Sequence, residues 1–220
     1  MSRIVEVYTG EYAAGKSENA LNRALEIARC GRKVTLVDLD IVEPAYTLRP
    51  IQDELRRMGV GVIAWRTEDT AGLGEAGTTL HPAARWALRR EGDVILDLGY
   101  GTEGIRTLNL VVGANTNPRL KVYNVVNTCR PLTAGVRDVV EQVRAMGRSD
   151  GLINNTHLGP ETTVSVVQDG ARKVAAAAKI LGLRVTATAV AKSIDGTIGR
   201  SDCMGNPVRE LRLMMHKAFW

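Results

Sequence analysis

Cysteine and aromatic residues are scarce in this 220-residue chain. The three cysteines, Cys30, Cys129 and Cys203, lie far apart and form neither a C-x-C nor a C-x-x-C motif. The sequence therefore predicts neither a zinc site nor a redox dithiol, and metal insertion by paired cysteines is disfavoured. With one Phe, three Trp and five Tyr, the chain must fill its core with Val, Leu, Ile and Ala.

Long hydrophobic runs are also absent, and the charge balance is only mildly basic. No apolar run approaches the ~20 residues that a transmembrane helix needs. The first expected strand begins near the N-terminus and leaves no room for a signal peptide, so we expect a cytoplasmic protein. A net charge of +5 is compatible with binding a nucleotide, nucleic acid or an acidic surface, and it does not choose among them.

Apolar runs alternate with helical patterns along the whole chain, without a repeat or a linker. We expect strands at residues 3–8, 33–37, 59–65, 93–97, 120–126, 151–153 and 184–190. We expect helices at residues 18–30, within 41–58, at 82–90, within 103–113, and at 133–146, 163–181 and 207–220. This alternation predicts a single α/β domain over residues 1–220, with a doubly wound, mostly parallel sheet flanked by helices. Ligands of such sheets bind beyond the carboxyl ends of the strands.

A glycine-bounded loop, Gly10-Glu11-Tyr12-Ala13-Ala14-Gly15-Lys16-Ser17, joins the first expected strand to the first expected helix. It matches the Walker A spacing G-x-x-x-x-G-K-[ST] at every fixed position. Glycines let backbone N–H groups face a polyphosphate, and the following helix directs its positive end at the same anion. Lys16 would bridge the outer phosphates during catalysis, and the Ser17 hydroxyl would ligate Mg²⁺. We expect nucleotide contacts at Gly10, Ala13, Ala14, Gly15, Lys16, Ser17 and Glu18.

Acidic residues end the second and fourth expected strands. Asp38 and Asp40 alternate in an extended chain, so both carboxylates are expected on one side, where they would hold Mg²⁺ or orient the attacking water. The alternative is an Asp that caps the next element. Asp97 follows an apolar run as in a Walker B motif and would bind Mg²⁺, with an acidic strand end facing solvent as the alternative. Gly99 would let a backbone N–H approach the γ-phosphate.

Asn154 and Asn155 leave the sixth expected strand. We predict that the Asn154 amide reads a purine edge, with an Asx turn as the alternative. The chain lacks the N-K-x-D motif typical of guanine-specific GTPases, which favours ATP. The histidines His81, His157 and His216 show no metal-ligand spacing and receive no role.

The phosphate loop at the N-terminus, the Asp38-Leu39-Asp40 segment and Asp97-Leu98-Gly99-Tyr100-Gly101 together resemble the ParA/MinD-like P-loop ATPases. The resemblance implies a switch I around Asp40, near the attacking water, and a switch II at residues 97–101. It also implies adenine near Asn154, and a homodimer. One departure concerns the loop, because Glu11 stands where that family has a signature lysine that reaches the partner subunit's nucleotide. Slow hydrolysis is the consequence that we expect.

Three functions remain open. The first is a Mg²⁺-ATP-dependent switch, with switch regions at residues 38–46 and 97–102, whose ATP or ADP state is sensed by an unknown protein partner. The second is a small-molecule kinase or ligase of the dethiobiotin-synthetase type, with its substrate near residues 66–80 and 127–133. The third is a DNA- or membrane-partition ATPase. The expected amphipathic helix at residues 207–220 would lie on an anionic membrane in that case, and would otherwise dock on its own sheet.

Overall fold

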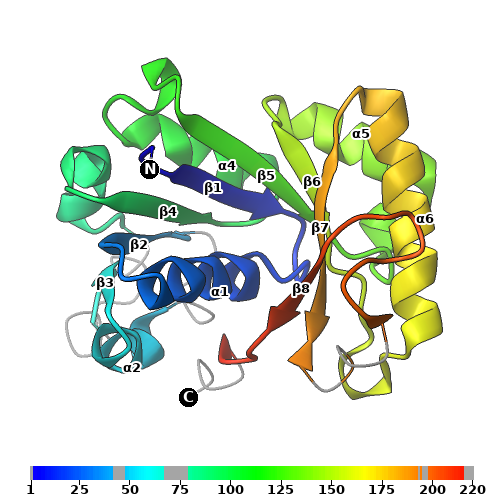
Figure 1. Ribbon diagram of the computed structural model, residues 1–220. Helices are drawn as coiled ribbons and strands as arrows, with labels where there is room; N and C mark the ends of the chain where they lie inside the picture. Colours follow the sequence, from blue (N-terminus) through cyan, green and yellow to red (C-terminus); the bar gives the residue numbers. More distant parts are fainter. Residues whose placement is uncertain (1, 42–47, 67–78, 193, 195–197, 216–220) are drawn as a thin grey trace. The chain divides into compact units, whose positions relative to one another are not determined.

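The computed structural model describes residues 2–41, 48–66, 79–192, 194 and 198–215 (Figure 1). Its strands are β1 (Val5–Gly10), β2 (Val34–Leu39), β3 (Val60–Ile63), β4 (Asp93–Leu98), β5 (Leu120–Val126), β6 (Gly151–Asn154), β7 (Val185–Ala191) and β8 (Val208–Leu211). Its α-helices are α1 (Lys16–Arg29), α2 (Gln52–Arg57), α4 (Gly101–Arg106), α5 (Val136–Met146) and α6 (Val164–Leu181). The strand order is β3-β2-β4-β1-β5-β6-β7-β8. No helix in the described part of the chain is long and apolar enough to cross a membrane.

The chain divides into two compact units. Unit 1 comprises residues 1–9, 20–121 and 214–220, and unit 2 comprises residues 10–19 and 122–213. Neighbouring strands within each unit pair in parallel. This pairing confirms the predicted α/β class with its mostly parallel sheet. The single-domain organisation over residues 1–220 stays a prediction.

Unit 1 is built on the strands β3-β2-β4-β1, of which β1, β2 and β4 are buried along their whole length. Continuous burial explains why apolar residues predominate on both faces of these strands, because strands covered on both faces need no polar alternation. Two acids on these strands, Glu6 and Asp93, have arginine partners. Arg23 binds Glu6 through two nitrogens at 3.0 and 3.1 Å, and Arg32 binds Asp93 at 2.7 Å.

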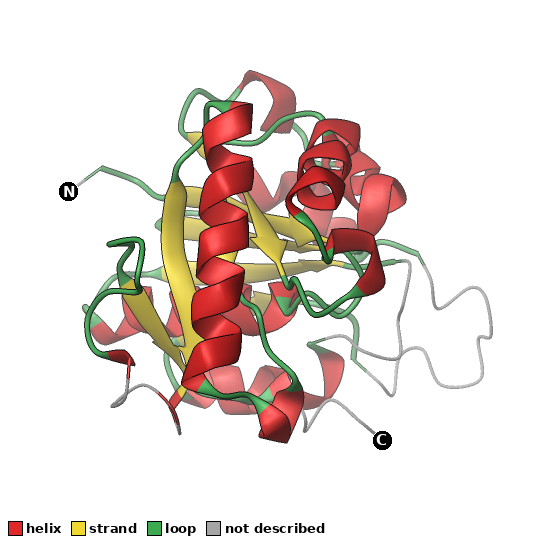
Figure 2. Cartoon of the chain, turned by 90° about the vertical axis from the view of Figure 1, so that its right-hand side faces the viewer, coloured by secondary structure: helices red, strands yellow, loops and turns green. Residues whose placement is uncertain are grey.

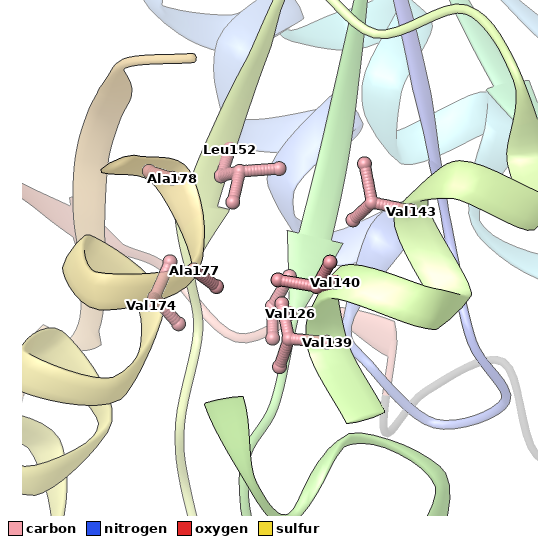
Figure 3. Packing of buried hydrophobic residues seen from close by; sticks show 8 residues of the cluster. All are labelled: Val126, Val139, Val140, Val143, Leu152, Val174, Ala177 and Ala178. Carbon is pink, nitrogen blue, oxygen red and sulfur yellow. The ribbon is translucent and has the colours of Figure 1, made fainter. Parts of the chain in front are cut away.

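Unit 2 packs α5 and α6 against β5 and β6. Its core is a cluster of aliphatic side chains from these four elements, shown in Figure 3: Val126, Val139, Val140, Val143, Leu152, Val174, Ala177 and Ala178. The helix α6 runs in front of the strands in Figure 2 and contacts β6 and β7. Its ends follow the sequence signals closely, since the Thr163 hydroxyl caps the N-terminus and Gly182 ends the helix at φ 67°.

The prediction of a helix at residues 207–220 is wrong for residues 208–211. These residues form β8, which pairs in parallel with β7 through Thr188 opposite Val208. The segment V-R-E-L is too short for its pattern of apolar residues to distinguish a strand from a helix. The edge of β7 supplies its hydrogen bonds, and the segment's own sequence does not indicate this. The membrane hypothesis loses this part of its helix, and residues 216–220 lie outside the described residues.

Two other helix predictions need correction. The helix expected at residues 133–146 begins later, because α5 begins at Val136 and Asp138 accepts the Gly135 N–H at 2.8 Å. Thr133 donates its hydroxyl to the Asn127 carbonyl at 2.6 Å. The expected helix at residues 82–90 is a 3-10 helix, Pro82–Arg89. The candidate switch residues 42–46 and most of the loop 66–80 lie outside the described residues.

Candidate nucleotide site

The phosphate loop leaves the buried strand β1 and belongs to unit 2. Two of its glycines are required by geometry. Gly10 has φ 150°, and a Cβ there would lie 2.3 Å from the Val125 carbonyl oxygen. Gly15 has φ 86°, and a Cβ there would lie 2.1 Å from the Asn155 Nδ2 atom. Both positions exclude a side chain by space as well as by backbone conformation.

Asn155 anchors this loop. Its Nδ2 donates to the Ala14 carbonyl at 2.7 Å, and its own N–H donates to the Val126 carbonyl at 2.7 Å. The side chain is buried, with 6% of its surface exposed. The exit of β6 is therefore hydrogen-bonded both to β5 and to the phosphate loop. We did not assign Asn155 a site role from sequence. The pair Asn154-Asn155 was the available signal, but it does not show which amide faces the loop.

Lys16, the first residue of α1, is buried and lies across its own loop. Its Nζ donates to the Glu11 carbonyl at 3.2 Å, and the Ala14 N–H donates to the same oxygen at 3.2 Å. The side chain is 7% exposed. Ser17 is half-buried and Glu18 is buried in the same first turn. The loop therefore gathers N–H donors and an ammonium at the positive end of a 14-residue helix, which is an arrangement suited to a polyanion.

The acidic residues Asp38 and Asp97 are register partners on the neighbouring strands β2 and β4 of unit 1. Paired residues of parallel strands project to the same face, and the strands lie ~4.8 Å apart. Both side chains are buried, at 8% and 1% exposed. Burial, and secondly the charge of Asp40, raise the pKa of Asp38 to about 7. Such a carboxyl holds a proton near neutrality, or needs a cation in its place.

Asp40 follows β2 and is half-buried, and its N–H donates to Asp38 Oδ1 at 3.0 Å. This hydrogen bond forms an Asx turn at the end of β2 itself. Gly99 follows β4 and is buried beneath α4, where a Cβ on Gly104 would lie 2.0 Å from its carbonyl oxygen. The predicted roles of Asp40 at the attacking water and of Gly99 at the γ-phosphate stay predictions.

The side chain of Asn154 makes other contacts than those we expected. Its Nδ2 donates to the Val167 carbonyl at 3.3 Å and to the Thr188 hydroxyl at 3.2 Å. Its Oδ1 accepts the Thr156 N–H at 3.2 Å and the Thr156 hydroxyl at 2.7 Å. The side chain is fully buried. The structure thus shows the Asx-turn alternative, and the amide predicted to read a purine edge is fully engaged inside unit 2.

Unit 2 therefore brings together the phosphate loop and Asn155, whereas unit 1 brings together Asp38, Asp40, Asp97 and Gly99. Among the described residues there is no group of three or more His, Cys, Asp or Glu arranged to hold a metal ion. The donor chemistry nevertheless fits Mg²⁺, which takes one or two carboxylates together with phosphates and water.

A scan against protein-family models and a search of the curated proteins both find no match. Solved structures do match. The cell division protein FtsY from Thermotoga maritima has a TM-score of 0.53 at 17% identity, covering 99% of this chain and 67% of that one. Chloroplast FtsY from Physcomitrella patens gives 0.53 at 18% identity, covering 86% and 58%. FtsY from Mycoplasma mycoides gives 0.54 at 15% identity, covering 84% and 60%.

At these identities the likeness shows the fold alone, which is the P-loop NTPase fold. The predicted fold class is confirmed on this ground as well. Membership of the ParA/MinD-like family is not shown.

Proposed function

We propose that this chain is a nucleotide-dependent switch that binds Mg²⁺-ATP on residues 10–17 and passes its state to a protein partner. The phosphate loop carries the proposal. Gly10 and Gly15 have the backbone that only glycine fits, Lys16 lies across the loop, and α1 begins at the same residue. Backbone N–H donors and the Lys16 ammonium at the start of a helix suit the phosphates of a nucleoside triphosphate.

Mg²⁺ belongs to the same proposal. The metal would lower the charge of the triphosphate, and its predicted protein ligands are Ser17, Asp38 and Asp97. Asp38 supports this choice, because its pKa is raised to about 7 by burial and by Asp40. A divalent cation would release the proton that such a carboxyl holds near neutrality.

ATP is the nucleotide that we propose. Guanine presents the N1–H and N2–H₂ donors, which require an acceptor such as a carboxylate. The segment after β6 reads Asn155-Thr156-His157-Leu158-Gly159-Pro160 and contains no acid before Glu161. Competition between ATP and GTP for the same loop tests this choice, and equal affinity for the two nucleotides contradicts it.

Turnover is proposed to be slow. Glu11 occupies the position of the signature lysine of the ParA/MinD-like family, so this position supplies no cation to a partner subunit. Its backbone carbonyl accepts a hydrogen bond from Lys16. A carboxylate near a triphosphate repels it. In this proposal Asp40 orients the attacking water and Lys16 stabilises charge on the phosphates. Binding, rather than rapid hydrolysis, would carry the signal.

Replacing Lys16 tests the proposal. Removing the ammonium from a triphosphate contact costs about 3 kcal/mol, so Lys16→Ala should weaken Mg²⁺-ATP binding roughly 100-fold in isothermal titration calorimetry. Lys192→Ala is the matched control, because Lys192 is exposed and pairs with Glu210 at 3.5 Å. Unchanged ATP affinity in a folded Lys16→Ala protein would overturn the reading.

A second candidate is phosphoryl transfer to a small acid, as in the kinase or ligase hypothesis. The observation that favours it is a pair of donors, the Arg130 guanidinium and the neutral His157 ring, in the same unit as the phosphate loop. A metabolite screen distinguishes the two functions. ATP turnover that rises sharply with one small acid supports transfer, whereas turnover that no acid stimulates supports the switch.

A further inference from the structure

The exits of β5 and β6 are joined into one surface by Asn127. Its Oδ1 accepts the N–H groups of Cys129 at 3.0 Å and of His157 at 3.2 Å, and its Nδ2 donates to the His157 carbonyl at 3.2 Å. A second tie runs from the Thr128 N–H to the Thr156 hydroxyl at 3.1 Å. The backbones of residues 127–130 and 155–157 are therefore fixed against each other, and the two loops act as one platform.

Arg130 lies on this platform, and no described residue accepts a hydrogen bond from its side chain. Its side chain is half-buried, and its Nε is buried with no hydrogen-bond partner. Other half-buried arginines have acceptors: Arg23 binds Glu6, Arg32 binds Asp93, and Arg3 donates to the carbonyls of Leu88 and Arg90. A buried donor left unsatisfied is costly, so an acceptor from outside the described chain fits here.

His157 adds a second donor beside it. The Gly159 N–H donates to its Nδ1 at 3.2 Å, so the neutral ring carries its proton on Nε2. Burial, and then the charge of Arg130, lower the pKa of His157, which keeps the ring neutral at pH 7. No carboxylate contributes to that shift. The platform therefore offers a guanidinium and an N–H donor, and no acid among the described residues pairs with either.

We propose that Arg130 and His157 form a subsite for an oxyanion, a carboxylate or phosphoryl group carried by a second ligand distinct from the nucleotide. Guanidinium groups match both oxyanions through paired N–H donors. The subsite adjoins the phosphate loop, because Asn155 donates to Ala14 and lies two residues before His157, a span of about 7 Å along the chain. The role of the second ligand rests on the proposed function. Binding of that ligand to the subsite does not, because it requires no nucleotide.

The test follows the ring signals of His157 by NMR in protein labelled with ¹⁵N-histidine, with His157→Gln used to assign the signals. Inorganic phosphate and succinate are titrated separately, first without nucleotide and then with saturating Mg²⁺-ATP. A saturable shift of the His157 signals is expected with one or both probes, and it persists with Mg²⁺-ATP present. The measured pKa of His157 rises when the probe is bound, because an adjacent anion favours the imidazolium.

Arg130→Gln should weaken probe binding at least 10-fold, with Arg130→Lys intermediate. Arg172→Gln should leave it unchanged, since Arg172 is exposed on α6 and pairs with Asp169. The proposal fails if neither probe shifts His157, if Arg130→Gln binds as tightly as the parent, or if Mg²⁺-ATP displaces the probe competitively. A failure of the proposed function can be told apart from a failure of the subsite. Unchanged ATP affinity in Lys16→Ala would contradict the proposed function, whereas the titration without nucleotide tests the subsite alone.

Discussion

The contact between Asn155 and the phosphate loop predicts a specific failure of additivity. In the parent protein, a Cβ on residue 15 would lie 2.1 Å from Asn155 Nδ2. Gly15→Ala should therefore push the amide away from the Ala14 carbonyl, which it now reaches at 2.7 Å. The single change would cost backbone strain of about 1–2 kcal/mol at φ 86°, plus about 1 kcal/mol for the lost hydrogen bond.

Asn155→Ala alone should cost that hydrogen bond, about 1 kcal/mol. In the double variant the bond is lost only once, so the two changes together should cost about 1 kcal/mol less than their sum. The free energy of unfolding in urea measures all four proteins of the cycle. Gly113→Ala is the matched control, because its φ is 85° and no atom lies within 4 Å of the added Cβ. Its cost should add to that of Asn155→Ala. Additivity within ~0.4 kcal/mol for the Gly15 pair would refute the anchoring role of Asn155.

Two further predictions concern a pH dependence and the last strand. The pKa of Asp38 is raised to about 7 in the folded protein from an ordinary value of 3.8, so the folded state retains a proton that the unfolded state has lost. This contribution to stability is full at low pH and is lost as the pH rises from about 4 to 7. Asp38→Asn should reduce the change in the free energy of unfolding between pH 4 and 7 by up to roughly 4 kcal/mol, as measured by urea denaturation. An unchanged pH dependence would contradict the raised pKa of Asp38. Leu211→Ala in β8, where the side chain is 2% exposed, should cost about 2–3 kcal/mol, whereas Leu213→Ala at 55% exposed should stay within ~0.5 kcal/mol. Equal effects of the two changes would show that residue 211 is not packed as a buried strand residue.

Local signals predicted the elements whose ends are determined by their own residues. The strand β5 occupies the expected residues 120–126, and α6 lies within one residue of its expected bounds because Thr163 and Gly182 cap it. The phosphate loop was predictable for the same reason, since its glycines and its lysine act within eight residues. Each of these features needs little information from distant parts of the chain.

Features decided by distant residues were not predictable. β8 is a strand because β7 offers it an edge, and the four residues Val208–Leu211 alone do not reveal this. Asn154 and Asn155 are adjacent at the end of β6, so their side chains point in opposite directions. The Asn154 side chain bonds Thr188, and the Asn155 side chain bonds Ala14. The sequence predicted a substrate near residues 127–133 under one hypothesis, but it did not single out Arg130, because an arginine in a loop is ordinary until its surroundings are known.

The hydrogen bond from Asn155 to Ala14 joins residues 141 positions apart and therefore affects the order of folding. A helix such as α1 forms from local contacts, but this anchor closes only after β6 has been synthesised and paired with β5. Partly folded chains accordingly lack the finished phosphate loop, and under the proposed function they would not bind the nucleotide. A ligand that binds only the finished state adds about 2.7 kcal/mol at a concentration 100 times its Kd. Nucleotide concentration would then control the yield of folded chain as well as the occupancy of its site.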